Sequence, residues 1–319
     1  MTSARLKQCI DELTARFPFI TISEIGKSRL GCPIYALTLG RGKKSVLVNA
    51  AHHANEWITA NLAMQFLEEC AAAENTTWMN ETILHMIPMV NPDGVDLVTG
   101  ALAVALCQNG YTEVAVDADE HSSPLRVGEH CVLPHLLPPL YGCPNTSQIT
   151  NNEPFPSGWK ANILGVDLNS NYPAGWAQAK RHKFERGYTK PGPRDYVGAF
   201  PLCEPESAAM AAYTIANDFA YTISLHTQGE VIFWQYQDYD PSGAKALAQR
   251  LSAASGYELE DVPDTSSHAG YRDWFIEKFN RPGMTIECGL GENPLPLSDF
   301  ADIYKKVAPL LWEAIFFQP

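Results

Sequence analysis

The 319-residue sequence lacks several features that mark large classes of protein. No apolar run reaches the roughly 18 residues that a membrane-spanning helix needs, so we do not expect an integral membrane protein. No cluster of five or more Lys and Arg occurs, and 23 basic residues stand against 36 acidic ones, which gives a formal net charge of −13. Because non-specific phosphate binding depends on clustered positive charge, we expect no nucleic-acid partner.

Cysteine is also scarce, with eight residues and no Cys-x-x-Cys pair, which is too dilute for a disulfide scaffold. Two of the three residues Cys107, Cys131 and Cys143 could still form a disulfide bridge. Asp11 and Glu12 interrupt the segment where a secretory signal would need an uncharged apolar stretch. We therefore expect a cytoplasmic protein, or an exported one if a signal has been removed.

The periodicity that is present alternates between short apolar runs and amphipathic stretches, and 45% apolar residues suffice for a large core. Strands are predicted at 19–25, 33–39, 45–50, 82–90, 221–226, 231–236 and 283–288. Helices are predicted at 6–17, 57–73, 204–218, 271–280 and 298–316, with another after Pro241. This alternation indicates an α/β fold with a mixed, mostly parallel β-sheet flanked by helices.

Two segments interrupt the alternation. Asn91-Pro92-Asp93-Gly94 is predicted to be a turn that stops the strand before it. Residues 101–158 have little periodicity and hold five Pro between positions 124 and 144. Because loops of this length are usually functional, we expect this excursion to form a lid or a wall.

Polar side chains follow three of the predicted strands. His53 and Glu56 come three residues apart after strand 45–50, His226 ends strand 221–226, and Glu287 ends the strand near 283–288. A lone His-x-x-Glu is a weak pattern, since a packed His and a capping Glu explain it equally well. A buried salt bridge would likewise explain Glu287. Two His and one Glu together form the ligand set of a catalytic zinc site that keeps a position for water.

The other histidines near these positions have simpler interpretations. His52, beside His53, is predicted to be a structural neighbour, and His85, inside an apolar strand, a buried core histidine.

Ordered motifs then carry a resemblance to a known family. They are H-A-N-E (53–56), N-P-D-G (91–94), G-V-D-L-N (165–169), S-L-H-T (224–227), D-W (273–274) and T-I-E (285–287). With these motifs the sequence resembles the zinc carboxypeptidase superfamily, which implies a single zinc peptidase domain over 1–319.

Further stretches resemble one branch of that superfamily, the γ-D-glutamyl-L-diamino acid endopeptidases, which cut the stem peptides of bacterial peptidoglycan. They are W-K-A-N (159–162), G-P-R-D-Y-V-G (192–198), E-P-E (204–206), H-T-Q-G-E (226–230) and P-G-M-T-I-E-C-G-L-G-E-N-P-L-P (282–296).

The resemblance implies roles for individual residues. His53, Glu56 and His226 would bind one Zn²⁺, and Glu287 would be the general base and proton shuttle. Lys160 stands where the family has an arginine that stabilises the oxyanion, and a solvated surface charge is the alternative for it.

The sequence departs from the family pattern around the substrate. Exopeptidases of the family have an arginine after G-V-D-x-N that binds the substrate's terminal carboxylate, whereas here Asn169 is followed by Ser170, which we assign to the substrate site. Thr265 replaces the family's mobile tyrosine, and His268 or Tyr271 could substitute for it.

Three more residues enter the predicted substrate site. Arg272 stands at the position that lines the specificity pocket in the family. It would bind an acidic group of the leaving residue, unless it is a surface arginine paired with Asp273 or Glu277. Asn169 and Gln228 are assigned to the substrate wall by the resemblance alone.

The leading hypothesis is therefore a zinc metallopeptidase that hydrolyses the γ-D-glutamyl–meso-diaminopimelate bond of stem peptides or murein fragments. One alternative is a zinc carboxypeptidase that releases acidic C-terminal residues from ordinary peptides. Another is a non-catalytic protein that binds murein peptides.

Overall fold

The computed structural model describes residues 1–74, 76–102, 126–127, 130–131, 155–263 and 267–318. The loop excursion predicted at 101–158 therefore lies largely outside the described residues, as do Thr265, Cys107 and Cys143.

An eight-stranded sheet forms the centre of the molecule, in the order β1-β2-β4-β3-β7-β10-β8-β9. Its strands are β1 (Thr21–Lys27), β2 (Pro33–Gly40), β3 (Lys44–Ala50), β4 (Thr82–Ile87), β7 (Phe219–His226), β8 (Val231–Phe233), β9 (Glu258–Glu260) and β10 (Gly283–Glu287). A short separate pair is formed by β5 (Arg126–Val127) and β6 (His130–Cys131). The pairs β3–β4, β3–β7, β7–β10 and β8–β9 are parallel, and the pairs β1–β2, β2–β4 and β8–β10 are antiparallel. The predicted mixed α/β sheet is confirmed.

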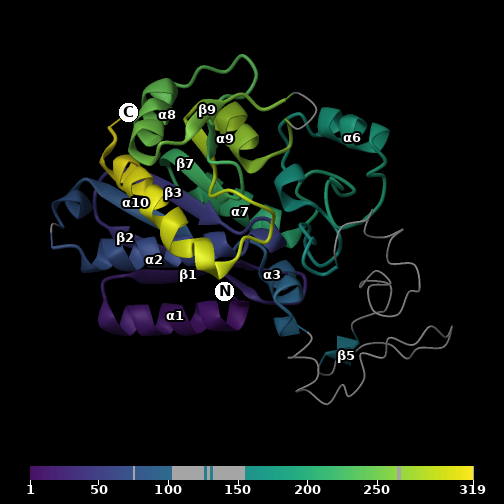
Figure 1. Cartoon of the computed structure of the whole chain (residues 1–319), viewed down its shortest axis with the longest axis horizontal. Coiled ribbons are helices and arrows are strands. Elements are labelled where there is room, and N and C mark those ends of the chain that lie inside the picture. The colour runs from purple at the N-terminus through teal and green to yellow at the C-terminus, as the bar shows by residue number, and fades with distance from the viewer. Residues whose placement is uncertain (75, 103–125, 128–129, 132–154, 264–266, 319) are drawn as a thin grey trace.

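Helices cover both faces of this sheet (Figure 1). The α-helices are α1 (Ser3–Arg16), α2 (Ile58–Ala72), α3 (Pro92–Val98), α6 (Trp176–Glu185), α7 (Pro205–Ala216), α8 (Ala244–Ser255), α9 (Tyr271–Phe279) and α10 (Phe300–Phe316). The 3-10 turns are η1 (Ala54–Glu56), η2 (Thr77–Asn80), η3 (Leu168–Ser170) and η5 (Leu297–Asp299).

Alternation along the strands divides the core between the two faces. On β3, Val46 and Val48 pack into a cluster with α1, α2, α8 and α10, whereas Leu47 between them packs into a second cluster with α7 and α9. This is the two-residue period expected of a strand buried on both sides.

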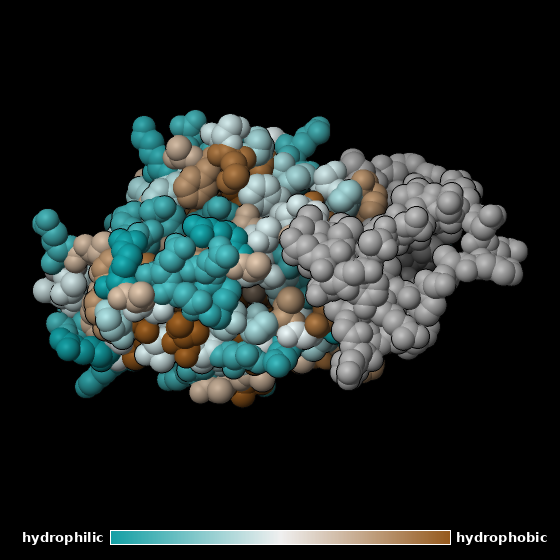
Figure 2. Space-filling model, turned by 90° about the horizontal axis from the view of Figure 1, so that it is seen from below, coloured by the Kyte–Doolittle hydropathy of each residue, from teal (hydrophilic) through white to brown (hydrophobic). Residues whose placement is uncertain are grey.

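The outer surface is predominantly polar where the structure describes it. Helix α1 buries Leu6, Ile10 and Leu13 and exposes its other face. On the side seen in Figure 2, hydrophilic side chains dominate and hydrophobic ones form small separate groups. Among the described residues, no helix has both the length and the apolar character required to cross a bilayer.

Three parallel neighbours bring their carboxyl ends to one edge of the sheet. Ala50 at the end of β3 is paired with Leu225 of β7, and His226 of β7 with Glu287 of β10. Ligand sites of α/β proteins lie at such edges, and the polar segments after β3, β7 and β10 meet here.

The structure corrects three predicted elements. The predicted turn at 91–94 begins helix α3, because the Asn91 side chain accepts a hydrogen bond from the Gly94 amide (3.1 Å) and Pro92 suits a first helical turn. The strands predicted at 82–90 and 231–236 end at Ile87 and Phe233. Helix α6 and strand β9 were not predicted.

Candidate active site

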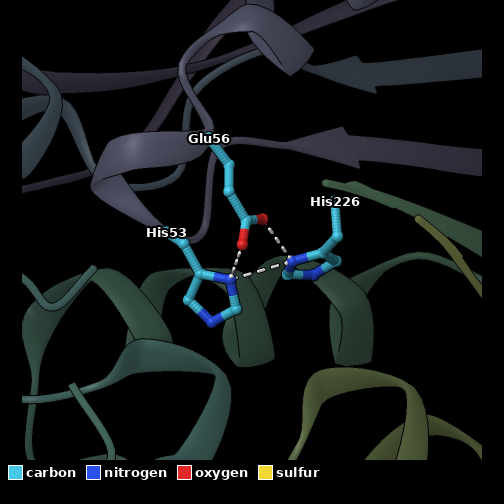
Figure 3. Close-up of side chains that lie close together, drawn as sticks. All are labelled: His53, Glu56 and His226. Atoms are coloured by element: carbon cyan, nitrogen blue, oxygen red, sulfur yellow. Dashed lines mark hydrogen bonds and ion pairs between the residues drawn. The ribbon is translucent and has the colours of Figure 1, made fainter. Parts of the chain in front are cut away.

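His53, Glu56 and His226 meet at the carboxyl edge of the sheet (Figure 3). His53 lies three residues after the end of β3, η1 places Glu56 beside it, and His226 is the last residue of β7. The Glu56 carboxylate contacts His53 Nδ1 at 2.9 Å and His226 Nδ1 at 2.8 Å, and the two Nδ1 atoms lie 3.0 Å apart. All three residues are buried. The predicted convergence of side chains 173 positions apart is confirmed.

The donor set fits a zinc ion. Two imidazole nitrogens and one carboxylate oxygen face one another, with all ligand atoms within 4.8 Å. Two His and one Glu are the protein ligands of a class of catalytic zinc sites. Although burial alone would raise it, the charges of His53 and Lys160 hold the pKa of Glu56 well below its usual range. Burial lowers the pKa of His226. Glu56 and His226 therefore have the charge states that bind a metal, whereas the carboxylates of Glu56 and Asp167 raise the pKa of His53 against the effect of burial.

Asp167 contacts His53 on the side of the ring that faces away from Glu56 and His226. Its Oδ1 lies 3.3 Å from Nε2 of His53, the ring nitrogen turned away from the other two candidate ligands. Although burial opposes ionisation, His53 and Lys160 hold the pKa of Asp167 far below its usual range. A carboxylate on the outer nitrogen of a ligating histidine fixes its tautomer and orientation. Asp167 is not among the predicted site residues, although the G-V-D-L-N motif contains it.

Lys160 and Glu287 flank the candidate ligands. Lys160 Nζ lies 3.6 Å from Glu56 Oε1 with its side chain 25% exposed, so it is not a freely solvated surface charge. Although burial opposes its charge, Glu56 and Asp167 raise the pKa of Lys160, which keeps it protonated. Burial and the negative charge of Glu56 raise the pKa of Glu287 to about 8.

The alternative interpretation of Glu287 as a buried salt bridge is not supported by the described residues. Among them, Glu287 has no partner in an ion pair.

Two cavities open on this edge and share Lys160, Arg194, Phe233 and Glu287. The first, of about 360 Å³, continues past His53 toward Asn169, Ser170, His268, Arg272 and Asp273. The second, of about 710 Å³, continues past Asn55 toward Gln228, Gly229, Glu260, Glu292 and Asn293. The cleft therefore has two lobes that meet at the side chains predicted to be catalytic.

The predicted substrate residues fall on both lobes. Asn169, Ser170, His268 and Arg272 line the first cavity, and Gln228 lines the second. Their roles in binding remain predictions.

Arg272 combines features of both interpretations offered for it. Its Nε donates to Asp273 Oδ1 at 3.0 Å, which is the ion pair expected if Arg272 were a surface arginine. The side chain is nevertheless only 6% exposed and lines the first cavity, as expected of a substrate-site residue. Asn169 also has a structural bond, because its Oδ1 accepts the Tyr271 amide at 3.0 Å.

The two proposed substitutes for the mobile tyrosine differ in position. His268 has a left-handed backbone (φ 74°), and its Nδ1 lies 3.0 Å from the Tyr236 hydroxyl at the first cavity. Tyr271 is buried with its hydroxyl 2.9 Å from Thr214 Oγ1, which holds it in the core.

The two structural histidines behave as predicted. His52 is buried with Nε2 3.0 Å from the Tyr172 hydroxyl. His85 is buried with Nδ1 2.7 Å from the Tyr213 hydroxyl, and burial lowers its pKa to about 4.

Comparison with known proteins agrees with this geometry. The family model for zinc carboxypeptidases matches residues 6–296. The γ-D-glutamyl-L-diamino acid endopeptidase 1 of Lysinibacillus sphaericus is 36% identical over 317 residues, covering 96% of this chain and 70% of that protein.

Solved structures share the fold. Carboxypeptidase A of Helicoverpa armigera superposes with a TM-score of 0.68 at 17% identity, covering 99% of this chain and 73% of that one. The murein-tripeptide amidase of Escherichia coli O157 superposes with a TM-score of 0.52 at 18% identity, covering 93% and 92%.

Proposed function

The chain belongs to the zinc carboxypeptidase family and is a zinc metallopeptidase, and on that basis we propose that it cleaves peptidoglycan stem peptides. The bond would be the amide between γ-linked D-glutamate and meso-diaminopimelate or a related diamino acid. The name of the Lysinibacillus sphaericus relative supports this choice of substrate.

The observation that carries the proposal is the charge pattern of the first cavity. Ser170 stands where exopeptidases of the family have an arginine that binds the terminal carboxylate of the substrate. Because serine carries no charge, this position does not require the substrate to have a free terminal carboxylate. The ion pair of Arg272 with Asp273 lines the same cavity. The far end of diaminopimelate carries one carboxylate and one ammonium group. A paired cation and anion complement that end, with Arg272 binding the carboxylate and Asp273 the amine.

His53, Glu56 and His226 would hold the zinc, with Asp167 orienting His53. Zinc, when bound, acts as a Lewis acid toward water and the scissile carbonyl. The remaining chemistry belongs to side chains at the junction of the two cavities.

Glu287 would move the proton. As a carboxylate it accepts a proton from the attacking water while the water oxygen bonds to the carbonyl carbon, and it then delivers that proton to the leaving nitrogen as the carbon–nitrogen bond breaks. Burial and the negative charge of Glu56 raise its pKa, which strengthens it as the proton acceptor of the first step.

Lys160 would stabilise the negative charge that develops on the carbonyl oxygen. Its ammonium lies beside the candidate metal ligands and lines both cavities, and Glu56 and Asp167 keep it charged. A fixed cation in a site shielded from water is an effective form of transition-state stabilisation.

The remaining predicted residues would form walls for the substrate. Asn169 and His268 lie with Ser170 on the leaving-residue side, and Gln228 lies on the acyl side, where the γ-glutamyl group would be placed.

Mass spectrometry of the products tests the proposal. The tripeptide L-Ala-γ-D-Glu-meso-diaminopimelate should yield L-Ala-γ-D-Glu and free diaminopimelate, and amidation of the terminal α-carboxyl should leave the cleavage in place. A protein that spares this tripeptide and instead trims acidic residues from ordinary peptides would be the carboxypeptidase considered above.

A further inference from the structure

We propose that Arg194 binds the α-carboxylate of the γ-linked glutamyl residue and thereby selects a γ-linked acidic residue on the acyl side of the scissile bond. This inference rests on the proposed function and identifies the side chain that distinguishes γ-linked from α-linked glutamate.

The linkage itself creates the need for such a residue. When glutamate is joined through its side-chain carboxyl, its α-carboxylate stays free. Three carbon atoms, Cγ, Cβ and Cα, separate this carboxylate from the scissile carbonyl. That anion must enter the cleft on the acyl side, close to Glu287 and Lys160. Burying a carboxylate without a cationic partner is costly, so a cation is expected at this position.

The described walls of the second cavity offer two cations, Lys160 and Arg194. The other charged residues of that lining are Glu260, Glu287 and Glu292, which would repel a carboxylate. Lys160 Nζ already faces Glu56 at 3.6 Å beside the metal ligands. Arg194 lines both cavities with its side chain 39% exposed, so it borders the junction where the α-carboxylate would lie.

The backbone ties Arg194 to the catalytic segment. The carbonyl of Pro193 accepts hydrogen bonds from the Lys160 and Ala161 amides at 2.8 and 2.9 Å. The next residue, Asp195, donates its amide to Asp167 Oδ2 at 3.1 Å. The position of Arg194 is therefore fixed relative to Lys160 and to the carboxylate that orients His53.

The side chain of Arg194 is held as well. Its Nε donates to Asp195 Oδ2 at 3.0 Å, and Asp195 also accepts from Lys183. Asp195 has a left-handed backbone (φ 65°), a conformation that non-glycine residues adopt at a cost and that clusters at functional sites. Guanidinium groups held in this way can form paired hydrogen bonds to a carboxylate, which is the ligand proposed here.

Matched substrates test the inference on the zinc-loaded enzyme. One is L-Ala-γ-D-Glu-meso-diaminopimelate, the second carries an amide in place of the glutamyl α-carboxylate, and the third carries an amide on the α-carboxyl of the leaving residue. The wild type should favour the first over the second by about 10- to 100-fold in kcat/KM, the range expected for a hydrogen bond to a charged group.

Arg194→Gln should remove this preference by losing activity on the first and third substrates while the second is cleaved as before. Arg194→Lys should restore part of the preference. The control is Arg186→Gln, an exposed arginine that stacks on Tyr188 outside the cavity walls, which should leave all three rates unchanged.

Equal losses of activity of Arg194→Gln on all three substrates would overturn the inference. It would also be overturned if Arg194→Gln lost activity on the first two substrates but not on the third, because Arg194 would then bind the α-carboxylate of the leaving residue. Calorimetry with the dipeptide L-Ala-γ-D-Glu gives a second readout, since Arg194→Gln should weaken its binding by the same factor. If the wild type cleaves no γ-glutamyl substrate, the proposed function fails, and the dipeptide measurement still decides whether Arg194 binds this carboxylate.

Discussion

His226 and Glu287 are register partners at the carboxyl ends of the parallel strands β7 and β10. The Cys288 amide donates to the His226 carbonyl at 2.8 Å and extends this ladder past the last paired residues. A candidate metal ligand and the proposed proton carrier are thus spaced by the sheet itself. Side chains on rigid strands hold their geometry better than side chains on loops, which favours a pre-organised site.

Glu287→Gln should separate metal binding from catalysis. The amide keeps the size of the side chain but cannot take up a proton, so we expect kcat on the tripeptide to fall by about 10²- to 10⁴-fold. Elemental analysis should still find one zinc per chain. Glu258→Gln, at an exposed position of β9, is the matched control and should behave as wild type. Full activity in a zinc-loaded Glu287→Gln enzyme would contradict the mechanism.

Lys160→Met should lower kcat far more than it changes KM, because the cation is needed most when negative charge develops on the carbonyl oxygen. Loss of one such group lowers kcat by about 10²- to 10³-fold. Lys160→Arg, which keeps the charge, should recover part of the rate. Steady-state kinetics at equal zinc content is the measurement, and a change confined to KM would assign Lys160 to ground-state binding instead.

Asp167→Asn should weaken zinc binding by about 10- to 100-fold, the usual effect of removing a carboxylate behind a ligating histidine. The reason is its 3.3 Å contact with His53 Nε2. Competition with a chromogenic chelator measures the affinity directly. Asp238→Asn, an exposed position, serves as the control. Unchanged affinity in Asp167→Asn would show that His53 is oriented by other contacts.

His85 should make the fold sensitive to mild acid. Burial lowers its pKa to about 4, so between the ordinary histidine value and this one the unfolded chain binds a proton that the folded chain excludes. Above about pH 6.5 His85 is neutral in both states and does not lower the free energy of unfolding. As the pH falls toward 4, protonation of the unfolded chain lowers that free energy by about 3 kcal/mol in total.

Denaturant unfolding at a series of pH values measures this effect. His85→Gln should flatten the curve in that window relative to the wild type. Parallel wild-type and variant curves would assign the acid sensitivity to other groups.

The Glu206 carboxyl acts in the opposite direction and has to be separated from His85. Burial raises its pKa to about 7, so the folded chain holds a proton that the unfolded chain releases near pH 4.5. Its contribution therefore declines as the pH rises through 7. For this reason the comparison for His85 is made between variant and wild type and not from the wild-type curve alone.

Much of the site could be predicted from the sequence because its residues end strongly apolar strands. The runs before His53, His226 and Glu287 are buried on both faces, so their ends could be located and their meeting at one edge anticipated. Helix α6 escaped prediction because it buries only Ala179 and Lys183 and has no apolar stripe.

The supporting residues could not be predicted for a related reason. Asp167 and Asp195 lie in irregular segments joined by hydrogen bonds between loops, and neither periodicity nor spacing indicates such bonds. The left-handed backbone of Asp195 gives no signal in the sequence either, because most Asp residues have a negative φ. In both cases the family motifs contained the residues without indicating their contacts.

The four side chains common to both lobes also determine how turnover ends. Whichever fragment dissociates first, the other would still contact Lys160 and Glu287, because these residues line each half of the cleft. Both fragments should therefore act as competitive product inhibitors, and the one that leaves more slowly would limit the rate at which the enzyme can accept its next peptide.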